Sequence, residues 1–230
     1  MFTVEALAAV PLVLGMVAAL AEGLRRESGA VIVNAVAALG VTFVPSAVLL
    51  PLGVGTPALV WELTLWVAAA SFLHTLGMLG LYESVMWWDH LTHTLSAGVL
   101  AAVFYPASVV TVSGYTDAPA PTVVVGVVTL GVILAAGIAW ELIELLAREL
   151  GKRYDIEPVL IHYGRRDTIL DLVFDVVGAV LVIALDVRLF FPIAERFPGT
   201  AASLLAGSAL LCAVGIVSLT VAIVFLRRQA

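Results

Sequence analysis

The chain has 230 residues, of which 62% are hydrophobic and only 12% are charged. A soluble domain is usually about a quarter charged, so this composition indicates an integral membrane protein with no separate soluble domain. The net charge of −6 argues against a nucleic-acid partner, because nucleic-acid-binding proteins need basic patches. Cys212 is the only cysteine, which excludes an internal disulfide and a cysteine-based metal site.

Seven apolar runs are long enough to cross about 30 Å of hydrocarbon as helices. We therefore predict an all-α bundle of seven transmembrane helices, which forms one integral membrane domain over residues 1–230. The spans are expected near residues 4–23, 30–51, 58–82, 88–111, 122–148, 168–190 and 200–226. No basic segment precedes the first run, so we expect a retained helix rather than a cleaved signal peptide.

The basic residues predict how these helices are oriented, because Lys and Arg collect on the cytoplasmic side. With the N-terminus outside, the outside segments hold only Arg188 and Arg196. The inside segments hold the other nine of the 11 basic residues, which are Arg25, Arg26, Arg148, Lys152, Arg153, Arg165, Arg166, Arg227 and Arg228. We predict a multi-pass protein of the cell (inner or plasma) membrane, with its N-terminus outside and its C-terminus inside.

Ionisable side chains recur at helical spacing near the expected cytoplasmic ends of the middle spans. Residues three or four apart share one face of a helix. The set comprises the pair Asp89 and His93, the pair Glu141 and Glu144, and the stripe Asp167, Asp171 and Asp175. A charged side chain at the centre of a membrane helix costs about 2.5–3.5 kcal/mol on insertion scales. We expect a chain that retains so many of them to gather them into a functional site.

Carboxylates crowded into a medium of low dielectric constant repel one another unless a cation lies among them. Together with imidazoles they suit a divalent ion, and Zn, Mn, Mg and Fe all fit such a set. The expected metal ligands are Asp89, His93, Glu141, Glu144, Asp167 and Asp171.

Two further roles are expected around this metal, one catalytic and one in substrate binding. His74, on the third span, and Asp171 are candidate catalytic groups, with His74 as a proton acceptor or a deep ligand. Arg165 and Arg166 precede the carboxylate stripe and are candidates for binding an anionic substrate. His90 and His162 are not expected to be ligands.

Simpler interpretations exist for several of these residues. Asp89 and Asp167 can act as N-caps of their helices. Glu144 can pair with Arg148 one turn later, and His74 can be a hydrogen-bonded contact between helices.

Several short motifs occur in a fixed order between residues 70 and 182. They are His74, Asp89-x-x-x-His93, Glu141-Leu142-Ile143-Glu144, and Asp167-Thr168-x-x-Asp171 followed by Gly178-Ala179. In this order and spacing the chain resembles the YjdF-like family of bacterial and archaeal inner-membrane proteins. The resemblance implies a helical membrane fold of unknown biochemical function, and the seventh span lies outside it. The Glu and Asp-x-x-x-Asp motifs show a more distant likeness to VanZ-like proteins.

Three functions are compatible with these features. The first is a divalent-metal-dependent enzyme that acts on a lipid or lipid-linked substrate, with membrane lipids as partners. The second is a cation or proton-coupled transporter, although the outer halves of the middle spans offer few polar groups for a path. The third is a structural protein in which carboxylates pair with basic residues between the helices. No span contains a lysine, which excludes a retinal Schiff base.

Overall fold

The computed structural model describes residues 3–115 and 122–228, and all of its regular elements within these ranges are helical. The prediction of an all-α fold is therefore confirmed. In chain order the elements are α1 (Val4–Arg26), α2 (Gly29–Thr42), α3 (Val44–Leu49), α4 (Pro57–Leu76), η1 (Gly77–Leu81), α5 (Tyr82–Ser84), α6 (Trp88–Ser113), α7 (Thr122–Tyr154), α8 (Arg165–Ala184), α9 (Phe191–Arg196) and α10 (Pro198–Arg228). The chain divides into two compact units, one up to Thr92 and one from His93 onward.

Six helical segments in the described part of the chain are long and apolar enough to cross a membrane. They are Val4–Arg26, Gly29–Leu49, Pro57–Ser84, Trp88–Ser113, Thr122–Tyr154 and Pro198–Arg228. Helix α8, which corresponds to the sixth expected span at residues 168–190, is not among them. Its first half carries three aspartates, Asp167, Asp171 and Asp175. The count of seven spans and their orientation remain predictions.

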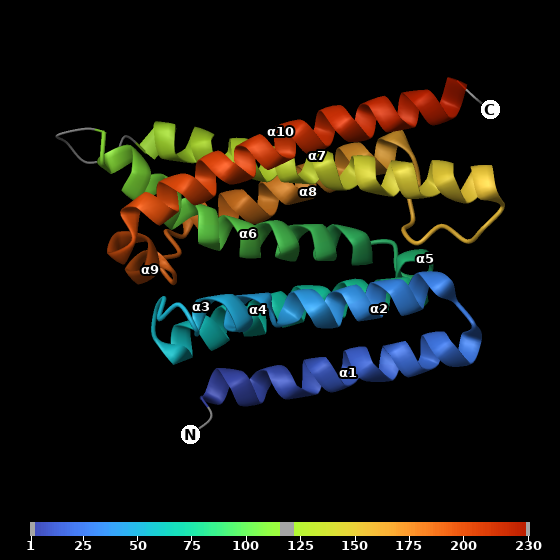
Figure 1. The fold of residues 1–230 in the computed structure, drawn as a ribbon, viewed down its shortest axis with the longest axis horizontal. Helices are drawn as coiled ribbons and strands as arrows, with labels where there is room; N and C mark the ends of the chain where they lie inside the picture. The colour runs from blue at the N-terminus through green and yellow to red at the C-terminus, as the bar shows by residue number, and fades with distance from the viewer. Residues whose placement is uncertain (1–2, 116–121, 229–230) are drawn as a thin grey trace. The chain divides into compact units, whose positions relative to one another are not determined.

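In unit 1, α1, α2 and α4 lie against one another (Figure 1). The second expected span is broken at Phe43, where α2 ends and α3 begins with Pro45 in its first turn. Proline has no N–H to donate to the preceding turn, so the interruption falls just before it. The third expected span ends in a π-helical turn in which Gly80 has φ of 125°, a conformation that glycine adopts without strain.

In unit 2, α7 packs against both α8 and α10 (Figure 1). Residues of α6, α7, α8, α9 and α10 share one apolar core that includes Ala101, Ile133 and Ala179. Helices α6 and α8 approach closely at Gly178, where a Cβ atom would overlap the carbonyl oxygen of Thr94. This contact brings the polar halves of the two helices together.

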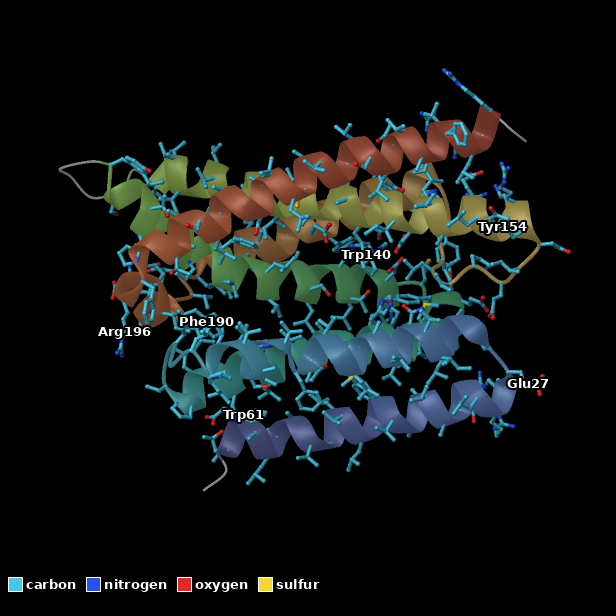
Figure 2. All side chains as sticks on the ribbon, in the orientation of Figure 1. Glu27, Trp61, Trp140, Tyr154, Phe190 and Arg196 are labelled. Carbon is cyan, nitrogen blue, oxygen red and sulfur yellow. The ribbon has the colours of Figure 1, made fainter. Side chains whose placement is uncertain are left out.

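Two helices in unit 2 end at other residues than the expected spans do. Helix α7 continues to Tyr154, six residues beyond the expected end, and the following loop folds back onto Gly151, whose backbone oxygen accepts from the N–H of Ile156 at 3.0 Å. Helix α8 ends at Ala184 instead of near 190, because the chain turns through Asp186 in a left-handed conformation with φ of 48°. Figure 2 shows Tyr154 at one end of unit 2 and Phe190 and Arg196 at the other.

Candidate metal centre

Two glutamates and a histidine meet in unit 2, between α7 and the loop that joins it to α8. Glu141, Glu144 and His162 each offer a ligand atom, and these atoms lie within 4.8 Å of one another. His162 Nδ1 and Glu141 Oε2 lie 4.0 Å apart. The glutamates share one face of α7, as their spacing predicts. His162, which was not expected to be a ligand, completes the set.

Glu141 is the most unusual member of this set. Its side chain is only 6% exposed. No group in the described part of the chain lies in hydrogen-bonding geometry to either of its oxygens, although the Thr168 hydroxyl approaches it from α8. His162 Nδ1 is likewise buried without a hydrogen bond from the described residues. Buried polar atoms are normally hydrogen-bonded, which makes these atoms candidate ligands for a cation.

His162 lies outside the membrane-spanning segments, in the loop between α7 and α8. Burial, and then the positive charge of Arg148, lower the pKa of His162 below its usual value. The imidazole is therefore neutral at pH 7, and the neutral imidazole is the form that binds a metal ion.

Glu144 is held in place by its own helix. The indole Nε1 of Trp140 donates a hydrogen bond to Glu144 Oε1 at 2.8 Å (Figure 2 labels Trp140 on α7). One oxygen of Glu144 is thus oriented by the tryptophan, which fixes the direction of the other.

A second group of acidic and imidazole side chains joins α6 to α8. His93 Nδ1 lies 3.0 Å from Asp175 Oδ1, and both side chains are nearly buried, at 11% and 8% exposure. Asp175 rests directly on the backbone of α7, because a Cβ atom at Gly137 would overlap its Oδ2. His93 and Asp171 also offer ligand atoms within 4.8 Å of each other. Glu141 is within electrostatic reach of His93 and Asp175, so the two groups form one polar region.

This region holds all the buried charged side chains in the described part of the chain. They belong to Glu141, Glu144, Asp171 and Asp175, each of which is at most 9% exposed as a whole residue. Every described lysine and arginine is at least partly exposed. Among the ion pairs that the structure shows, Lys152 and Arg227 contact Glu149 at 3.8 and 3.0 Å.

The remaining predicted ligands lie at helix starts. Asp89 is in the first turn of α6, in unit 1, one turn before His93. Helix α6 begins at Trp88 and α8 has Gly164 as its N-cap, so Asp89 and Asp167 lie inside their helices and the N-cap interpretation is wrong for Asp167. Both are half-buried.

The other predicted residues are placed as follows. Arg165 and Arg166 are the exposed first two residues of α8. His74 lies in unit 1, where its Nδ1 is 2.7 Å from Tyr82 Oη and its Nε2 is 2.9 Å from Asn34 Oδ1. It therefore makes the hydrogen-bonded contact between helices that was one of its two interpretations.

Comparison with known proteins identifies a family for most of the chain. A family model described as "Predicted membrane protein (DUF2238)" matches residues 7–190. This is the family that the YjdF-like motifs indicated, and the match extends well beyond residues 70–182 while leaving α10 outside. The likeness to VanZ-like proteins has no support from it. No curated protein and no solved structure matches the chain.

Proposed function

We propose a function for this chain, which belongs to the DUF2238 family of predicted membrane proteins. It binds a divalent metal ion through Glu141, Glu144 and His162, and it uses the ion in chemistry on a lipid or lipid-linked substrate.

The observation that carries the proposal is the state of Glu141. A charge taken out of water costs several kcal/mol unless a partner compensates it, and neither oxygen of Glu141 has a hydrogen-bond partner among the described residues. A cation between Glu141, Glu144 and His162 supplies that partner, and it also occupies the buried Nδ1 atom of His162.

The composition of the ligand set limits which metal ions the site can prefer. One imidazole and two carboxylates favour a borderline ion such as Zn²⁺, Mn²⁺ or Fe²⁺ over Ca²⁺, which takes six to eight oxygen ligands. Three protein ligands leave at least one coordination position open, as in catalytic zinc sites, where water or substrate takes the fourth position. A metal ion at such a position lowers the pKa of bound water and polarises an ester or phosphoryl oxygen.

The depth of the site supports a lipid substrate. Glu141 is 19 residues after Thr122, the first residue of α7, which corresponds to about 28 Å along the helix. The hydrocarbon core is about 30 Å thick, so a helix that enters at Thr122 brings Glu141 close to the opposite interface, where headgroups lie. Arg165 and Arg166 are exposed at the start of α8, and guanidinium groups bind phosphate in a bidentate manner.

Metal analysis of the detergent-purified protein tests the binding step. After equilibration with Zn²⁺ and desalting, the wild type should retain zinc, and Glu141→Gln and His162→Ala should lose at least tenfold in affinity. Glu149→Gln is the matched control, since it makes the same substitution on α7 at a residue that pairs with Arg227 instead. Equal zinc affinity in all four proteins would refute the proposed site.

The chemical step is tested separately with vesicles of mixed phospholipids. Lipid turnover should disappear on treatment with a chelator and return with Zn²⁺ or Mn²⁺, and it should be absent in Glu141→Gln. Cation flux in the same vesicles without any lipid product would favour the transporter instead.

A further inference from the structure

We infer that this centre holds a second divalent cation, between His93 of α6 and Asp171 of α8. The inference rests on the proposed metal site of Glu141, Glu144 and His162, and adds to it a second ligand set and the number of ions bound.

The first argument is the geometry around His93. Its ring is fixed by the 3.0 Å contact between Nδ1 and Asp175 Oδ1. Histidines that ligate metals almost always donate their other ring N–H to a carboxylate or carbonyl, which sets the tautomer and orients the ring. Asp175 therefore accepts the hydrogen bond from His93 Nδ1–H. This leaves His93 Nε2 as the nitrogen that binds the cation. Asp171, one turn before Asp175 on α8, supplies the oxygen ligand within 4.8 Å.

The second argument is that the fold makes room for this carboxylate–histidine pair. Asp175 reaches its position only because residue 137 of α7 has no side chain, since a Cβ atom there would overlap Asp175 Oδ2. Gly178, one turn further along α8, lets that helix approach α6 closely. Two small residues thus bring His93, Asp171 and Asp175 together.

The third argument is the balance of charge. Four carboxylates are buried in this region, and no lysine or arginine in the described ranges is buried with them. Carboxylates buried without a basic partner are stabilised by cations, and a second divalent cation brings two more positive charges into this region. The buried Glu141 carboxylate lies within electrostatic reach of both His93 and Asp175, so a cation at either position acts on it.

The two positions use different residues, which makes them separable by mutation. His162 belongs only to the first set and His93 only to the second. Removing either imidazole should therefore remove one ion and retain the other, and His90 provides a matched control as another histidine on α6.

The experiment counts ions in the detergent-purified full chain. The protein is equilibrated with excess Mn²⁺, desalted, and analysed by inductively coupled plasma mass spectrometry. We expect two Mn²⁺ per chain for the wild type and for His90→Ala. We expect one for His93→Ala, for the isosteric Asp171→Asn, and for His162→Ala, each checked for a single monodisperse peak in gel filtration.

The possible outcomes distinguish failure of the second cation site from failure of the proposed site at Glu141, Glu144 and His162. One Mn²⁺ in the wild type that is lost in His162→Ala and kept in His93→Ala refutes the second cation, while the proposed function stands. Two Mn²⁺ that both persist in His93→Ala and Asp171→Asn also refute the inference, because the second ion then lies elsewhere. No bound Mn²⁺ or Zn²⁺ in the wild type contradicts both statements.

Discussion

Replacing Gly137 by alanine perturbs the centre without changing any of its polar residues. The new Cβ atom would overlap Asp175 Oδ2, so the carboxylate must move away from α7. That movement breaks its 3.0 Å contact with His93 Nδ1 and releases the ring. Losing the carboxylate partner of a metal-ligating histidine typically costs 10- to 100-fold in metal affinity. This corresponds to about 1.4–2.8 kcal/mol of binding free energy.

The substitution should weaken metal binding but stabilise helix α7 itself, because alanine is about 1 kcal/mol more favourable than glycine in a helix interior. Gly131→Ala is the matched control, since it lies on α7 with open space at the position of the new Cβ atom. The assay is the dissociation constant for Mn²⁺ of the purified protein, measured by titration calorimetry. Gly137→Ala should bind the second Mn²⁺ at least tenfold more weakly than Gly131→Ala does. Equal binding by the two variants would refute the role assigned to Asp175.

Three further predictions address packing, pH and an interaction outside the centre. Gly178→Ala should destabilise unit 2 by about 1–3 kcal/mol, as overpacked sites do, because the new Cβ overlaps the Thr94 oxygen; an unchanged Tm in detergent would contradict this. Zinc binding should persist at pH 7 and be lost as the pH falls below 6.5, because a lowered pKa keeps His162 neutral until more acidic pH; a midpoint above 6.5 would contradict the assignment. Tyr105→Phe removes the 2.7 Å hydrogen bond to Asp186, so it should lower Tm slightly and leave the metal stoichiometry unchanged. A loss of bound metal in this variant would contradict the expectation that this hydrogen bond is independent of the centre.

Hydropathy alone located most of the helices, because the length of an apolar run does not depend on its neighbours. The expected run 88–111 corresponds to α6, which ends at Ser113, and the run 200–226 corresponds to α10. Helix α7 extends past the expected span for a local reason. Gly151 lies within the last turn of the helix, and the returning loop contacts it there.

The spacing of the acidic residues predicted which of them share a helix face. It did not predict which residues of other helices they contact. Every fourth residue of a helix advances by about 40° around the axis, so the stripe of three aspartates turns gradually across α8. Asp171 and Asp175 are buried, whereas Asp167 is only half-buried. The pairing of Asp175 with His93 depends on how α6 and α8 cross, which a single sequence does not specify.

His162 is the residue that the structure brings to the glutamates although the sequence did not indicate it as a ligand. It is 21 residues after Glu141, in a loop with no periodicity from which a contact could be predicted. One signal was available, because the connection contains a run of apolar residues, Val159, Leu160 and Ile161, directly before His162. Leu160 is 7% exposed in the structure, so the loop next to His162 is partly buried.

The central claim is that a cation lies between Glu141, Glu144 and His162. Crystals grown with Mn²⁺ and measured at a wavelength with strong manganese anomalous scattering test it most directly. The account predicts an anomalous peak within about 2.0–2.3 Å of the carboxylate oxygens and the imidazole nitrogen. An anomalous map without a peak at these three residues, from protein saturated with Mn²⁺, would contradict it.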